Sequence, residues 1–130
     1  MISYRAASSA PAAEAWSLIA RPARWHEWAP HVRGAWGLGV AEVELGARGA
    51  ARLLGAVPVP ARVSAKQPGR SWTWEVGPVS MVHRVTPRAG GCEVAVEISA
   101  PAPLERAVGL AYGPLVGALV RRLARKAQRG

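Results

Sequence analysis

Two side chains in this sequence have the chemistry and the placement to move a proton to or from a bound molecule. His83 lies in a run that predicts a strand, and Tyr112 lies midway along a run that predicts a helix. The purely structural alternatives, a buried neutral histidine and an amphipathically packed tyrosine, are the more common roles of such residues. The sequence therefore offers His83 and Tyr112 as candidate catalytic residues and leaves the purely structural interpretation open.

Other combinations of reactive residues do not form a recognisable site. His26, Glu27 and His31 match neither the HExxH nor the Cys/His spacing of zinc sites, and they lie in a segment flanked by prolines. Cys92 is the single cysteine, so it has no disulfide partner in this chain. The sequence contains no G-x-S-x-G motif and no glycine-rich phosphate loop after a strand. We therefore expect no metal and no cofactor.

A predicted hairpin over residues 80–99 would position His83. If residues 86–91 form its loop, His83 lies opposite Val94, and Arg84 lies opposite Glu93 as a possible ion pair. Alternation then places a mainly apolar set on one face: Met81, His83, Val85, Cys92, Val94, Val96 and Ile98. In the preceding strand, Trp72 and Trp74 alternate with polar residues and are expected beside His83.

The remaining elements follow from periodicity and from glycine and proline punctuation. A short helix is expected between Pro11 and Pro22, and a second short helix or turn carries Trp25 and Trp28. Strands are expected at about 2–8, 32–39, 47–54, 56–66, 70–76, 79–86 and 92–99. A long helix is expected from Pro103 to about Arg129, with its buried stripe at Leu104, Val108, Ala111, Leu115, Leu119 and Leu123.

Composition indicates one domain, residues 1–130, with a substantial core, because half of the residues are hydrophobic and 19% are charged. The net charge is +9, but most arginines are scattered singly, so we expect no nucleic-acid partner. The basic cluster at 121–129 complements the dipole of the last helix, and a contact with an anionic membrane or an acidic partner stays open. The amino terminus lacks the apolar run of a signal peptide, which favours a cytoplasmic location.

Several motifs resemble the SRPBCC superfamily, the START-related helix-grip proteins, and within it the polyketide cyclase/dehydrase and lipid-transport branch. They are Glu14-x-Trp16, Trp25-x-x-Trp28-x-Pro30, Gly46-x-x-Gly49, Trp72-x-Trp74, His83, residues 90–94 and the long last helix. The resemblance covers nearly the whole chain. It implies an α+β helix-grip fold, in which a seven-stranded antiparallel sheet wraps around the C-terminal helix and two short helices follow the first strand.

Both the order of elements and the resemblance predict a protein that binds a hydrophobic small molecule or lipid between the sheet and the last helix. The expected ligand-binding residues are Trp36, Trp72, Trp74, Met81, His83, Val108, Ala111, Tyr112 and Leu115. Two alternatives stay open. One is an enzyme of the aromatase/cyclase or dehydrase kind that uses His83 and Tyr112, and the other is a module that docks on a membrane or an acidic partner. The ligand and the oligomeric state are not encoded in these patterns.

Overall fold

The computed structural model describes residues 2–28, 32–36, 38, 42–53, 58–76 and 78–129; within these ranges, the side chains of 26, 32–36, 51–53, 58–59, 104, 107–113 and 129 are not described. The elements are β1 (Ile2–Ser8), α1 (Ala12–Ala20), the 3-10 helix η1 (Pro22–Glu27), β2 (Val32–Trp36), β3 (Arg48–Leu53), β4 (Pro58–Gln67), β5 (Ser71–Val76), β6 (Val79–Arg88), β7 (Gly91–Ser99) and α2 (Leu104–Arg129). This order confirms the expected strand, short helices, run of strands and long helix.

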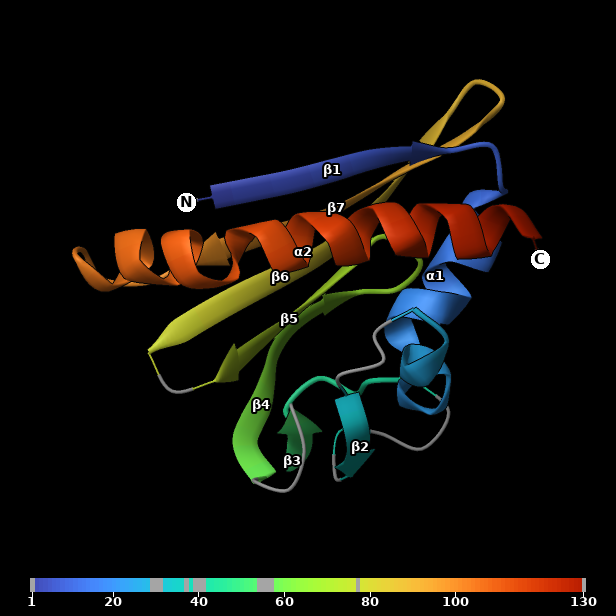
Figure 1. Cartoon of the computed structure of the whole chain (residues 1–130). Coiled ribbons are helices and arrows are strands. Elements are labelled where there is room, and N and C mark those ends of the chain that lie inside the picture. The colour runs from blue at the N-terminus through green and yellow to red at the C-terminus, as the bar shows by residue number, and fades with distance from the viewer. Residues whose placement is uncertain are drawn as a thin grey trace.

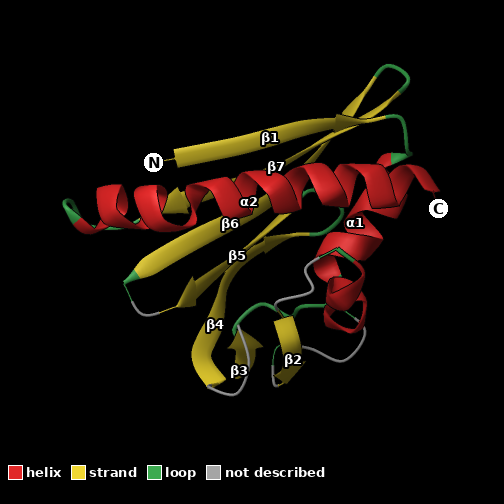
Figure 2. Ribbon diagram, viewed as in Figure 1, coloured by secondary structure: helices red, strands yellow, loops and turns green. Residues whose placement is uncertain are grey.

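The strands form one curved antiparallel sheet in the order β1-β7-β6-β5-β4-β3-β2. Helix α2 lies across one face of this sheet, where it contacts β1 and β7, and α1 packs against α2 near its C-terminal end (Figure 1). Both short helices are thus on the side of the sheet that α2 covers (Figure 2). The α+β class and the helix-grip-like architecture are confirmed. We call the covered side of the sheet the inner face.

The β6–β7 hairpin differs from the prediction in its register. Arg88 pairs with Gly91, so the turn is two residues long, and His83 pairs with Val96 instead of Val94. Gly90 makes this tight turn with a φ of 79°, a conformation that is costly for residues with a Cβ. The predicted register is wrong by two residues, and since side chains alternate with a period of two, the predicted faces are unchanged.

The inner face of this hairpin is apolar, as the alternation predicts. Val85, Cys92, Val94, Val96 and Ile98 are buried together with His83, whereas Met81 is half-buried. This part of the prediction is confirmed.

The predicted ion pair on the opposite face is wrong because of the register shift. The guanidinium of Arg84 is 3.1 Å from Glu97 Oε1, and the carboxylate of Glu93 is 3.4 Å from Arg5 Nη1.

In its described C-terminal half, helix α2 buries Leu123 of the predicted stripe but not Leu115, and the side chains of Leu104, Val108 and Ala111 lie outside the described residues. The buried residues in its described C-terminal half are Val116, Val120, Leu123, Ala124 and Ala127. Leu115 is 38% exposed and Leu119 is only half-buried, so the stripe is rotated by about one residue. The hydroxyl of Ser8, at the end of β1, donates to the carbonyl of Ala124 at 2.9 Å and fixes this orientation.

Candidate functional site

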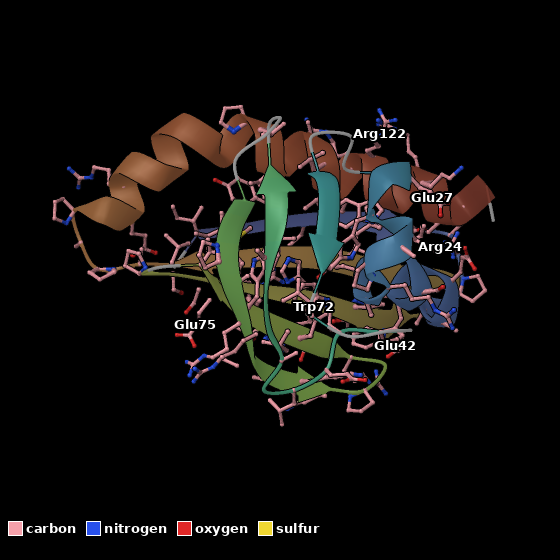
Figure 3. All side chains as sticks on the ribbon, turned by 90° about the horizontal axis from the view of Figure 1, so that it is seen from below. Arg24, Glu27, Glu42, Trp72, Glu75 and Arg122 are labelled. Atoms are coloured by element: carbon pink, nitrogen blue, oxygen red, sulfur yellow. The ribbon has the colours of Figure 1, made fainter. Side chains whose placement is uncertain are left out.

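Four aromatic side chains from three elements stack on the inner face. Trp72 lies between two parallel rings: the centroid of His83 is 4.0 Å away and that of Trp25, from η1, is 5.6 Å away. Trp74 stands nearly perpendicular to all three rings, with centroid distances of 5.6 to 5.9 Å. The cluster forms a rigid apolar wall in the interior of the curved sheet, where Figure 3 shows Trp72.

Indole N–H groups anchor this wall to the C-terminal end of α1. Trp25 and Trp72 both donate to the carbonyl of Ile19 at 3.0 Å, and Trp28 donates to the carbonyl of Leu18 at 2.9 Å. The last carbonyls of a helix have no partner within the helix, so these indoles satisfy acceptors that would otherwise be buried without a hydrogen bond. The cluster and α1 therefore hold each other in place.

A second contact, through Arg24, fixes η1 against α1. The guanidinium of Arg24 bonds both carboxylate oxygens of Glu27, at 2.8 and 3.2 Å; both residues are labelled in Figure 3. It also bonds Glu14 Oε1 and Ser17 Oγ. The hydrogen bond with Glu27 is the main reason that the pKa of Arg24 is raised. Because Trp25 follows Arg24 directly, this network orients the outer ring of the aromatic stack.

His83 is the titratable group of the aromatic cluster, and it is neutral at pH 7. The residue is 5% exposed, and burial lowers its pKa to about 4. Its Nδ1 lies 3.4 Å from the carbonyl of Trp72, a long contact that offsets little of the cost of desolvation. With this pKa, His83 can serve as an uncharged polar contact or a weak base but not as a reservoir of protons near neutral pH.

Trp74 differs from the anchored tryptophans because its buried Nε1 has no hydrogen-bond partner among the described residues. The residue as a whole is 7% exposed. In the sheet, Trp74 pairs with Val63 of β4 and with Met81 of β6, so it lies between two apolar neighbours. The wall thus contains one N–H donor whose hydrogen-bonding capacity is unused.

Burial decreases along the inner face toward the β5–β6 turn. The pair Trp72 and His83 is buried, the next pair is Trp74 with the half-buried Met81, and Val76 and Val79 are both half-buried. On β1, the inner-facing Ile2 and Tyr4 are half-buried as well. The C-terminal half of α2 closes the other end of the face with fully buried side chains such as Leu123. The inner face is therefore fully buried near the C-terminal half of α2, whereas near the β5–β6 turn its apolar side chains are partly exposed.

The predicted site residues separate into three groups. Trp72, Trp74, Met81 and His83 come together on neighbouring strands, as expected. Leu115 is exposed and does not belong to the buried stripe of α2. The side chains of the other candidates, Trp36, Val108, Ala111 and Tyr112, lie outside the described residues.

Sequence reasoning missed Trp25 as a member of the aromatic cluster. The sequence shows the Trp25-x-x-Trp28 pattern, but no neighbouring residue indicates that Trp25 stacks on Trp72, which lies 47 positions later in the chain. The available signal was the presence of two tryptophans, Trp25 and Trp28, in the short segment between Pro22 and Pro30.

The described ranges contain neither a metal site nor a membrane-spanning helix. No group of three or more His, Cys or Glu side chains in them could hold a metal ion. None of the helices in the described part of the chain is long and apolar enough to cross a membrane. Arg121, Arg122 and Arg125 are exposed on α2, and no described acidic side chain pairs with them.

Comparison with solved structures finds the same fold in bacterial proteins. Protein MLL2253 from Mesorhizobium loti superposes with a TM-score of 0.79 at 17% identity, covering 98% of this chain and 96% of that one. The polyketide cyclase-like protein Cgl2372 from Corynebacterium glutamicum gives 0.68 at 17% identity, with coverages of 95% and 88%. CalU16 from Micromonospora echinospora gives 0.63 at 18% identity, with coverages of 96% and 79%.

At the level of sequence, no curated protein matches the chain. The sequence profile of one family, described as polyketide cyclase/dehydrase and lipid transport, matches residues 2–129, almost the full length. The chain therefore belongs to the polyketide cyclase/dehydrase and lipid transport family.

Proposed function

We propose that this protein binds a hydrophobic small molecule or lipid between the inner face of the sheet and α2. The observation that carries the proposal is the decrease of burial along β5 and β6, from Trp72 and His83 to Val76 and Val79. Partly uncovered apolar side chains next to a rigid aromatic wall are typical of ligand sites, which are mostly apolar and contain few polar groups. Membership of a family that includes lipid-transport proteins supports the same proposal.

Binding without catalysis accounts best for the chemistry of the described inner face. General acid–base catalysis works most efficiently when the pKa of the catalytic group is near the working pH, and the pKa of His83 is about 4. The described inner-face neighbours of His83 are apolar or aromatic and supply no second titratable group beside it. We therefore assign His83 to the wall of the site and not to a proton-transfer step.

The proposal is tested with two lysine substitutions at neighbouring positions of β6. Met81 and Val82 are both half-buried, but Met81 faces inward and Val82 faces outward. The neutral dye Nile red serves as the probe, since its emission rises in an apolar site. Met81→Lys should weaken Nile red binding by about tenfold or more, because the substitution places a charge on the apolar wall. Val82→Lys should leave the affinity within about twofold, as expected for a solvated surface charge. Failure of the wild-type protein to bind Nile red or any other apolar probe, or equal effects of the two substitutions, would contradict the proposed site.

A further inference from the structure

We propose that the indole N–H of Trp74 donates a hydrogen bond to the ligand, so that the ligand presents an uncharged oxygen acceptor, such as a ketone, quinone or ester carbonyl, at this point of the wall. The inference rests on the proposed function, because it assigns the chemistry of a molecule bound at the same site.

Three other buried indoles in the described part of the chain have hydrogen-bond acceptors. Trp25, Trp28 and Trp72 donate to backbone carbonyls at 2.9 to 3.0 Å. Trp74 is the tryptophan in the described part of the chain whose buried Nε1 has no acceptor. A donor that leaves water without gaining a partner destabilises the folded state, whereas a phenylalanine at the same position would carry no such penalty. The unused N–H is therefore explained if its partner arrives with the ligand.

The position of Trp74 agrees with this role. It lies one pair beyond the fully buried Trp72 and His83, directly across from the half-buried Met81. A molecule resting on Met81, Val76 and Val79 would meet Trp74 at its inner end, where the face changes from uncovered to closed. Trp74 thus lies where such a molecule would meet the closed part of the face.

The surroundings indicate that the acceptor is uncharged. The inner-face residues next to Trp74, namely Val63, Val76, Val79 and Met81, are all apolar, and His83 is neutral. In sequence, residues 107–120 of α2 carry no charge. A carboxylate buried beside Trp74 would find no described cation to compensate for its lost hydration, whereas a carbonyl oxygen needs only one donor.

The test compares two probes that have the same planar ring system and differ in one group. Fluorenone carries a carbonyl where fluorene carries a methylene, and each displaces Nile red if it binds at the site. We measure the ratio of the two affinities in the wild-type protein and in two variants. Trp74→Phe removes the unpartnered N–H. Trp28→Phe, outside the aromatic cluster, removes an N–H that already has an acceptor.

The expected result is that Trp74→Phe reduces the preference for fluorenone over fluorene by about tenfold, the scale of one buried hydrogen bond. Trp28→Phe should leave the preference as in the wild type. An indole ¹⁵N–¹H spectrum provides a readout without mutation: the Trp74 N–H resonance should shift downfield with fluorenone and much less with fluorene.

Two outcomes separate the inference from the function on which it rests. If both probes bind but Trp74→Phe leaves their ratio unchanged, or if the Trp74 resonance responds equally to both, the hydrogen bond is absent and the binding function stands. If neither probe displaces Nile red and no apolar probe binds, the proposed function itself fails.

Discussion

Because His83 is buried in its neutral form, the free energy of unfolding should depend on pH. Burial lowers the pKa of His83 from 6.5 to about 4, which means that the folded protein binds a proton less readily than the unfolded chain does. Below pH 6.5, the unfolded state therefore takes up a proton that the folded state rejects, and the free energy of unfolding falls as the pH falls. The change continues until the pH passes about 4, where the folded state is also protonated.

The size of the effect follows from the two pKa values. A fall of the pKa from 6.5 to about 4 corresponds to a total loss of about 3 kcal/mol, of which about 2 kcal/mol is lost already at pH 5. The range from pH 5 to 7 lies above the ordinary pKa of glutamate, so protonation of the surface ion pairs contributes little there. His83→Phe keeps an aromatic ring next to Trp72 and removes the titrating group.

Urea unfolding at several pH values between 5 and 7.5 measures this contribution. The wild-type protein should lose about 2 kcal/mol more between pH 7 and pH 5 than His83→Phe does. An NMR titration that places the pKa of His83 near 6.5, or the same loss of stability in both proteins, would refute the assignment of His83 as a buried neutral side chain.

Two further pairs of substitutions test the packing that holds the site. Gly91→Ala should lower the free energy of unfolding by about 3 kcal/mol or more, because the added Cβ would collide with the backbone of Ser8. Gly117→Ala should raise it by about 1 kcal/mol, since its Cβ would make only ordinary contacts at 3.6 Å. Equal effects in thermal or urea unfolding would contradict this packing. Val94→Asp should prevent folding, because it buries an unpaired charge. Arg84→Ala should lower the free energy of unfolding by about 0.5 kcal/mol, since its ion pair is on the surface. If thermal melts show that both substitutions are equally tolerated, the assigned faces of β6 and β7 are inverted.

The sequence predicted the order of the elements and the inner face of the β5–β7 strands because both depend on local alternation. Any register shift by an even number of residues preserves that alternation, which is why the faces were right although the pairing of His83 was two residues off. The hairpin turn is tighter than expected, since the strands continue through Pro87 to Arg88 and Gly91. Local patterns alone did not specify this length.

The periodicity of apolar residues could not predict the rotation of α2 about its axis. Leu115 is followed by Val116, and Leu119 by Val120, so two neighbouring stripes of the helix are equally apolar. The choice between them is made by contacts with distant residues, such as the hydrogen bond from Ser8 to Ala124. The same limit applies to the stacking of Trp25 on Trp72, which joins residues far apart in the chain.

The most direct measurement of ligand binding at the inner face uses Met81, one of the two methionines of the chain. In protein labelled with ¹³C in the methionine methyl groups, a bound apolar ligand should shift the Met81 signal, which lies across from the Trp74 ring, and should give NOEs between that methyl group and the ligand. Saturation with ligands that bind the protein, without any shift or NOE at Met81, would contradict the account.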